Sequence, residues 1–152
     1  MSHIQKSKKR LLDFPKIKRQ SENQLERLAR MKSAEVFPEI RLGNESKRNP
    51  GAGDRMASDI VRRLTYEDEI AADLESNLAE MDIVRRSIMA LPDRMEQDVL
   101  WFRYVEVDGY RPAKWREVAL QIYRDDSEEK VRAVTRLHGR ALEHIKWEDE
   151  IK

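Results

Sequence analysis

Basic side chains recur along one stretch near the C-terminal end of the sequence. Residues 130–142 contain four basic residues and no acidic one: Lys130, Arg132, Arg136 and Arg140. Residues four apart share a face of a helix, so the three arginines would form one stripe. Guanidinium groups in such a stripe can reach phosphate oxygens or guanine edges in the major groove of DNA. These residues, with Thr135 between them, are candidate nucleic-acid contacts; the alternative is that they form only a solvated helix face.

The helix that would carry this stripe follows a shorter one. Apolar residues at steps of three and four predict helices over about 113–123 and about 127–147, joined by a tight turn. This order is typical of a helix-turn-helix, in which the second helix lies in the major groove and the first crosses the DNA backbone. Lys114 and Arg116, on the first helix, are therefore predicted to touch that backbone.

Two acidic capping signals mark helix starts in this part of the chain. Pro92 ends the preceding helix, and Asp93 with Glu96 three residues later opens the most apolar segment of the sequence. Asp126 and Glu129 repeat this spacing before the last helix. From Pro92 to the C-terminus the sequence therefore predicts a small core of three or four helices.

The N-terminal half predicts long helices with few apolar residues. Residues 15–91 are expected to form a helical arm, with Pro15 in a first helical turn and a loop over 37–53, where Gly, Pro and Asn are dense. Within 54–91, apolar residues recur at alternating steps of four and three, as in a coiled coil: Ile60, Leu64, Ala71, Leu74, Leu78, Met81 and Ile88. Such a helix must pack against the helix that precedes it, against a second subunit, or against both.

The composition also favours slender helices. Hydrophobic and charged residues each make up 39% of the chain, and the mean hydropathy is -0.82, which is too polar for one large core. The net charge of +1 hides a basic start, because the first 20 residues carry seven basic side chains and one acidic side chain. Residues 1–14 are expected to be a disordered basic tail that holds phosphate by counterion release or only aids solubility.

The sequence lacks the usual signatures of an enzyme or a metal site. It has no cysteine, and His3, His138 and His144 are not spaced to share one metal ion. There is no Gly-rich phosphate loop, Ser-centred elbow or HExxH motif. We therefore predict no cofactor, no metal and no catalytic activity. No apolar run approaches a membrane span and no signal peptide is evident, so a cytoplasmic protein without a membrane partner is expected.

Several short motifs occur together in the C-terminal part of the chain. They are Leu91-Pro92-Asp93, Val99-Leu100, Arg103-Tyr104, Trp115-Arg116-Glu117-Val118-Ala119 and the run from Val134 to Leu142. In this order they resemble the region 4 helix-turn-helix of sigma-70-type factors. They are more similar to small phage and prophage late transcriptional regulators of the RinA and ArpU type. The resemblance is good over 91–145 and loose over 11–90.

The resemblance implies an all-α fold, in which a long helical hairpin or coiled-coil arm precedes a sigma region 4-like helix-turn-helix domain over 92–152. It also implies a DNA-binding transcriptional regulator of phage or prophage genes in a bacterial host cell. The implied partners are double-stranded promoter DNA, RNA polymerase and, through the arm, a second copy of the chain. The DNA contacts would be the seven polar residues already named: Lys114, Arg116, Lys130, Arg132, Thr135, Arg136 and Arg140.

The chain departs from this family in two connecting segments. The turn over 124–129 is longer and more acidic than the family pattern, and its four carboxylates would repel DNA phosphates. Either the last helix starts late, near Lys130, or its N-terminus does not enter a groove. The connection over 107–112 is also longer than usual.

Two other functions fit the same features. A small terminase-type DNA-packaging protein also joins a helix-turn-helix to helices that oligomerise, and it would form a ring of many subunits. A protein-interaction module would dock its acidic helix start on RNA polymerase without touching DNA.

Overall fold

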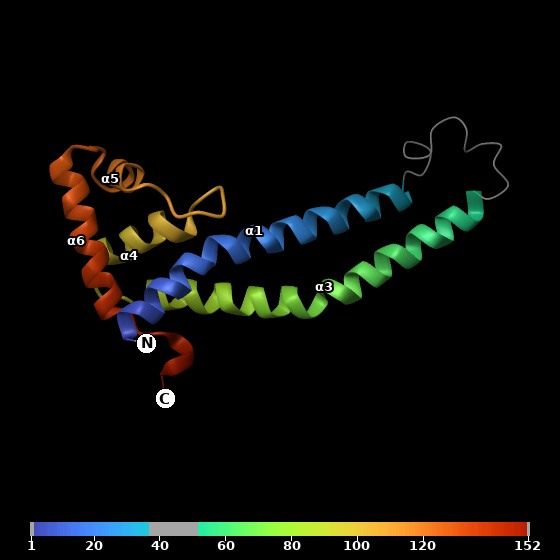
Figure 1. The fold of residues 1–152 in the computed structure, drawn as a ribbon, viewed down its shortest axis with the longest axis horizontal. Helices are drawn as coiled ribbons and strands as arrows, with labels where there is room; N and C mark the ends of the chain where they lie inside the picture. Colours follow the sequence, from blue (N-terminus) through green and yellow to red (C-terminus); the bar gives the residue numbers. More distant parts are fainter. Residues whose placement is uncertain (1, 37–51, 152) are drawn as a thin grey trace. The chain divides into compact units, whose positions relative to one another are not determined.

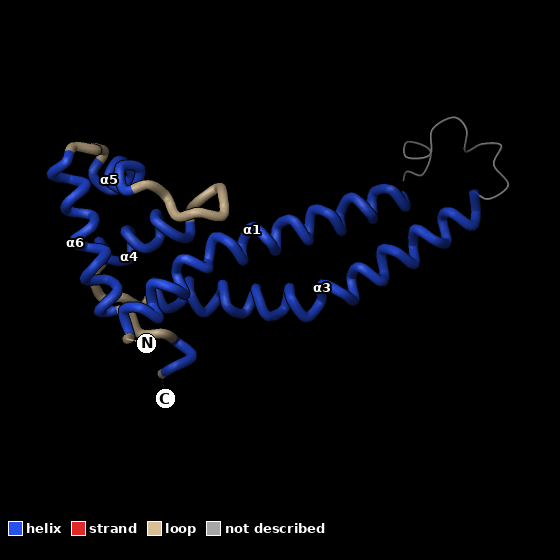
Figure 2. Tube along the Cα trace, viewed as in Figure 1, coloured by secondary structure: helices blue, strands red, loops and turns tan. Residues whose placement is uncertain are grey.

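The computed structural model describes residues 2–36 and 52–151, and these residues are helical or lie in short connections (Figure 1). The elements, in chain order, are α1 (His3–Val36), α3 (Ala52–Met89), α4 (Arg94–Leu100), the π-helix η2 (Trp101–Val105), α5 (Trp115–Tyr123), α6 (Glu128–His144) and the short 3-10 helix η3 (Glu148–Glu150). No strand occurs in these two ranges (Figure 2). The prediction of an all-α fold is confirmed.

The contacts divide the chain into two compact units. The core unit contains residues 1–19 and 77–152, and the two-helix unit contains residues 20–76. The helices α1 and α3 therefore contribute one part of their length to each unit. The predicted loop falls mostly on residues 37–51, which lie outside the described residues; residues 52 and 53 of that loop belong to α3.

The prediction of a disordered tail over residues 1–14 is wrong, because α1 begins at His3. Ser7, Leu11 and Phe14 lie one helical turn apart and are fully buried. The Nε1 of Trp147 donates a hydrogen bond to Ser7 Oγ at 2.9 Å. The many lysines make this segment look polar in the sequence, although it has a short apolar face. Burial of that face against residues distant in the sequence orders the helix.

The prediction that Pro15 starts a helix is also wrong, because Pro15 lies inside α1. Proline has no N–H, so the carbonyl of Leu11 loses its usual helical donor, at a cost of about 3 kcal/mol. Burying an aliphatic or aromatic side chain stabilises by about 1.5–3 kcal/mol, and both Leu11 and Phe14 are fully buried. Tertiary packing on either side of Pro15 thus offsets the loss and carries the helix through it.

The main core of the core unit joins both halves of the sequence. It contains Leu11 and Phe14 of α1, four apolar residues from Met81 to Leu91, the η2 region, and the C-terminal residues up to Trp147. The predicted domain boundary after residue 91 therefore cuts through this core. The C-terminal end of α3 packs with the segment that follows it because Met81, Val84 and Ile88 form one buried helix face.

A second, smaller core holds the last three α-helices, α4, α5 and α6, together. Val99 of α4, Val118 and Ala119 of α5, and Val134 of α6 are all fully buried in it. Half-buried side chains pack around them, among them Trp115 and Leu137. The small size of these central residues lets α5 lie close against α6.

In the two-helix unit, the seam predicted for α3 is displaced by one residue before Leu74, which is half-buried as predicted. Ile60 and Leu64, predicted to be inside, are 39% and 46% exposed, whereas Ile70 is buried at 5%. The half-buried positions before Ile70 include Arg63 and Tyr66. A count of apolar residues could not find this seam because part of its inner face is polar.

Polar pairs replace apolar packing along that seam. Arg63 of α3 forms two hydrogen bonds with the carboxylate of Glu35 of α1, at 2.9 and 3.0 Å, and a third with Glu67 at 3.1 Å. The guanidinium of Arg27 stacks over the ring of Tyr66, 4.6 Å from its centroid. These paired groups select the face of α3 that meets α1, and the aliphatic face is left in solvent.

Candidate nucleic-acid interface

The exposed face of α6 carries an uninterrupted arginine stripe. Arg132, Arg136 and Arg140 follow one another at intervals of four residues, and all three are exposed. Arg132 pairs with Glu128 at 3.4 Å, but both side chains are more than 70% exposed, so this pair contributes little stability. Within residues 2–36 and 52–151, Arg136 and Arg140 have no acidic group within ion-pair distance. Two of the three guanidinium groups of the stripe are therefore available to an external anion.

The opposite face of α6 is anchored in the core unit. Val134, His138, Ala141 and Leu142 are buried there. The ring nitrogen Nε2 of His138 lies 2.6 Å from the hydroxyl of Tyr104. Because these groups are held by packing and by a hydrogen bond, the arginine stripe projects from a fixed support.

His138 is surrounded by aromatic rings and positive charge. Its ring meets the ring of Trp115 edge-on, with centroids 4.8 Å apart. Burial lowers the pKa of His138 to about 4, and the charges of Arg103 and Lys8 act in the same direction. These groups leave the side chain of His138 buried. His138 is therefore a neutral internal support of α6.

Arg103, on η2, also belongs to this support. Its guanidinium stacks over Trp115 at 4.1 Å from the ring centroid and donates a hydrogen bond to the carbonyl of Ala113. The sequence contained Arg103-Tyr104 as a motif but gave no sign of its role. The contact joins the segment before α5 to η2, and so it sets the start of α5.

Both ends of the stripe are acidic. On a helical projection, Glu129 and Glu143 each lie within about 20° of Arg136, on the same exposed face. The positive surface of α6 is thus confined to about two central turns, between one carboxylate near each end.

The start of α6 differs from the predicted capping pair of Asp126 and Glu129. The cap is Ser127, whose hydroxyl accepts from Lys130 N at 3.5 Å, rather than Asp126. The helix begins at Glu128, close to the predicted start near residue 127, so the alternative of a late start near Lys130 does not apply. Carboxylates in the first turn stabilise the positive end of the helix dipole, which explains why the acidic residues can be helical.

The other predicted contacts on α6 are placed differently from the arginines. Lys130 is half-buried, about 120° around the helix from Arg136, with its ammonium 4.7 Å from the ring centroid of Tyr123. Thr135 is half-exposed beside the stripe, and its hydroxyl donates to the carbonyl of Arg132 at 2.8 Å. The structure therefore brings together the three arginines and separates Lys130 from them.

The two predicted contacts on α5 are exposed at its start. Lys114 is the N-cap residue and makes no side-chain capping bond, and Arg116 lies in the first turn. The turn that leads from α5 to α6 is fixed by Arg124, which adopts a left-handed conformation with φ 55° and ψ 31°. This conformation is uncommon for a residue with a side chain, and here it ends α5 abruptly.

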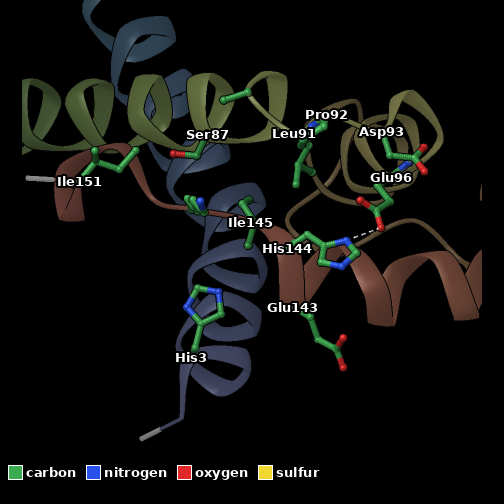
Figure 3. A pocket seen from close by; sticks show the side chains of 12 residues that line it. His3, Ser87, Leu91, Pro92, Asp93, Glu96, Glu143, His144, Ile145 and Ile151 are labelled. Carbon is green, nitrogen blue, oxygen red and sulfur yellow. Dashed lines mark hydrogen bonds and ion pairs between the residues drawn. The ribbon is translucent and has the colours of Figure 1, made fainter.

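A second polar site lies in a pocket of the core unit (Figure 3). The carboxylate of Glu96 is buried and accepts a hydrogen bond from Nδ1 of His144 at 2.8 Å. The pocket has a volume of about 920 Å³, and its apolar lining includes Leu91 and Ile145. Sequence reasoning assigned Glu96 only to capping; Asp93 alone performs that role, accepting from Met95 N and Glu96 N. Nothing in the sequence signals this pair, because its members are 48 residues apart.

In the described ranges, no group of three or more His, Asp or Glu side chains could hold a metal ion. None of the helices in those ranges combines the length and apolar character that a membrane span needs. Scans against protein-family models, curated proteins and solved structures each find no match to the chain.

Proposed function

We propose that the protein is a DNA-binding transcriptional regulator of phage or prophage genes, with α5 and α6 acting as a sigma region 4-like helix-turn-helix. The observation that carries this proposal is the exposed stripe Arg132, Arg136 and Arg140 on a helix whose other face is buried. A helix presented in this way has the width and charge to enter the major groove.

We expect electrostatic contacts with phosphates to contribute most of the affinity, and contacts with bases to contribute less. Each arginine that neutralises a phosphate releases a counterion, so the affinity should fall steeply with salt. Lys114 and Arg116, exposed at the start of α5, would hold the adjacent backbone and set the position of α6 on the duplex.

Fewer basic residues of α1 are available to bind phosphate than a disordered tail would offer, because some of them are bound within the fold. Arg10 forms ion pairs with Glu80 and Asp149, and Lys18 donates to the carbonyls of Val105 and Val107. Four lysines in the first half of α1 remain exposed: Lys6, Lys8, Lys9 and Lys16. We propose that these four add affinity that is independent of sequence.

The two-helix unit is the proposed contact for a second copy of the chain or for RNA polymerase. It exposes five large apolar side chains: Leu25, Met56, Ile60, Val61 and Leu64. Apolar groups in this density on a polar chain favour a protein partner.

The experiment is a binding titration of the variant Arg132→Ala/Arg136→Ala against a labelled duplex of about 30 base pairs. We expect an affinity loss of at least about tenfold at low salt, and a slope of log K against log salt that is smaller by about 2. The matched control is Arg55→Ala/Arg62→Ala, which removes the same charge from exposed positions of α3. Unchanged affinity and slope in the α6 variant would refute the recognition-helix assignment.

One observation favours a second candidate, a module that docks on RNA polymerase without touching DNA. Four exposed carboxylates gather at the start of α6: Asp125, Asp126, Glu128 and Glu129. This acidic surface would repel phosphate and suits a basic protein surface. No binding of the wild-type chain to any duplex at about 50 mM salt would favour this candidate.

A further inference from the structure

Gly139 lies in the middle of α6, between Arg136 and Arg140, and it is exposed. A Cβ atom added there would meet nothing within 4 Å apart from the adjacent residues and the nearby backbone of α6 itself. Packing inside the core unit therefore does not require a glycine at this position. Gly139 does not serve as a C-terminal cap either, since α6 continues to His144.

A glycine in this place weakens the helix. It gives the unfolded chain more conformational freedom than any other residue and adds no side-chain contact, so alanine would stabilise α6. The rest of α6 is well suited to a helix, with a serine cap, acidic residues in its first turn and a buried apolar face. The missing side chain at Gly139 thus lowers helix stability without a packing reason.

The position of Gly139 relative to the arginines suggests what the bare surface is for. On a helical projection it lies about 20° from Arg132 and about 60° from Arg136. It therefore leaves an area of uncovered helix backbone directly beside the charged stripe. Next to it, Thr135 uses its hydroxyl proton within the helix, on the carbonyl of Arg132.

We propose that Gly139 is the point where a DNA strand approaches α6 most closely, with a deoxyribose packed on the bare helix and flanking phosphates held by Arg136 and Arg140. The inference rests on the proposed function and specifies the part of α6 that performs it. A sugar has no charge and can pack against Cα, whereas a side chain would hold it away.

Two observations favour the sugar-phosphate strand over a base edge at this point. The flank formed by Gly139 and Thr135 offers no free donor to read a base. The carboxylates Glu129 and Glu143 lie near the two ends of the exposed face and keep phosphates away from those ends. DNA would therefore meet the central turns of α6, instead of the N-terminal residues that a recognition helix usually offers.

The test is a graded series, Gly139→Ala and Gly139→Leu, measured on two labelled duplexes of about 30 base pairs with unrelated sequences. We expect Gly139→Leu to weaken binding to both duplexes by at least about tenfold, and Gly139→Ala by about threefold, since a strand in close contact must move outward. Both substitutions should raise the melting temperature by about 2–4 °C, because helix propensity improves. The loss of affinity would then accompany a gain in stability, which a folding defect cannot explain.

The matched control is Ala79→Leu, which adds a large apolar side chain at an exposed position of α3 and should leave affinity unchanged. Wild-type affinity in Gly139→Leu would overturn the close approach while the proposed function stands. A loss confined to one duplex would overturn the sugar-phosphate contact, because that outcome indicates base reading. Absence of DNA binding by the wild-type chain would remove the proposed function, and this inference with it.

Discussion

The chain has two basic regions, which differ in whether their positive charges are paired within the fold. In the N-terminal part of α1, Arg10 is bound on two sides, by Glu80 and by Asp149 at 2.8 and 2.9 Å, and it lies 4.7 Å from the ring centroid of Trp147. On α6, Arg136 and Arg140 have no acidic partner within the described residues. A similar density of positive charge thus stabilises the fold in one place and is left open to a ligand in the other.

The difference follows from where the charges lie relative to apolar residues. In α1, Arg10 is adjacent to Leu11, at the edge of a buried face, so its stem is drawn into the core unit. In α6, the stripe is centred opposite the buried Val134 and His138, so its side chains point away from the core. Position on the helix, more than local net charge, decides which cations remain available.

The largest effect should come from the aromatic residue beneath Arg10. We expect Trp147→Ala to lower the free energy of unfolding by about 3–5 kcal/mol, because the side chain is 2% exposed and bonded to Ser7. Urea denaturation followed by circular dichroism measures this loss. Trp147→Phe keeps most of the packing and should cost only about 1–2 kcal/mol. Equal stability of Trp147→Ala and the wild type would contradict the structural role of this region.

Acid should weaken the support of α6. The pKa of His138 is about 4 in the folded chain, and an unfolded histidine titrates near 6.5. The unfolded chain therefore binds a proton that the folded chain refuses, so stability falls as pH decreases from about 6.5 to about 4, by about 3 kcal/mol in total. Chemical denaturation at a series of pH values measures the decline. His138→Gln should remove most of it, and an unchanged pH profile in that variant would refute the assignment.

The next largest effect should distinguish the stability contribution of Arg10 from that of its neighbour Lys9. Arg10→Ala removes two ion pairs and the contact with Trp147, and it should lower the free energy of unfolding by about 2 kcal/mol. Lys9→Ala removes the same charge from an exposed position and should change stability by less than about 0.5 kcal/mol. Thermal melts of the two variants compare them directly. If both variants melted together with the wild type, the bridging role of Arg10 would be excluded.

The smallest effect on stability is expected at Arg136 and Arg140, which have no acidic partner within the described residues. Arg136→Ala should alter the free energy of unfolding by less than about 0.5 kcal/mol, yet weaken duplex binding by about five- to tenfold. Fluorescence anisotropy gives the affinity and a thermal melt gives the stability. The contrast between the two regions would disappear if Arg136→Ala destabilised the fold as much as Arg10→Ala.

The sequence predicted the parts of this molecule that depend on local pattern. The helical class, the helix boundaries near Met89 and Tyr123 and the Asp93 cap all follow from spacing and capping chemistry. The arginine stripe was also found in this way, because a four-residue repeat needs no knowledge of distant contacts.

The remaining features depend on contacts between distant residues. Leu11 and Phe14 gave too weak an apolar signal to predict a helix before Pro15, and only their burial against residues beyond 80 reveals it. The seam of α3 was misplaced by one residue because Arg63 and Tyr66 face inward to meet partners on α1. Pairs at long range of this kind leave no periodic trace in a single sequence.

The hydrogen bond between Trp147 and Ser7 also bears on how the core unit folds. The two residues are 140 positions apart. A contact of such long range has a high loop-closure entropy and forms slowly. Leu11 and Phe14 also share a core with the C-terminal part of α3, which is much nearer in the sequence. We therefore expect α1 to pack with α3 first, and the segment around Trp147 to complete the core unit in a later step.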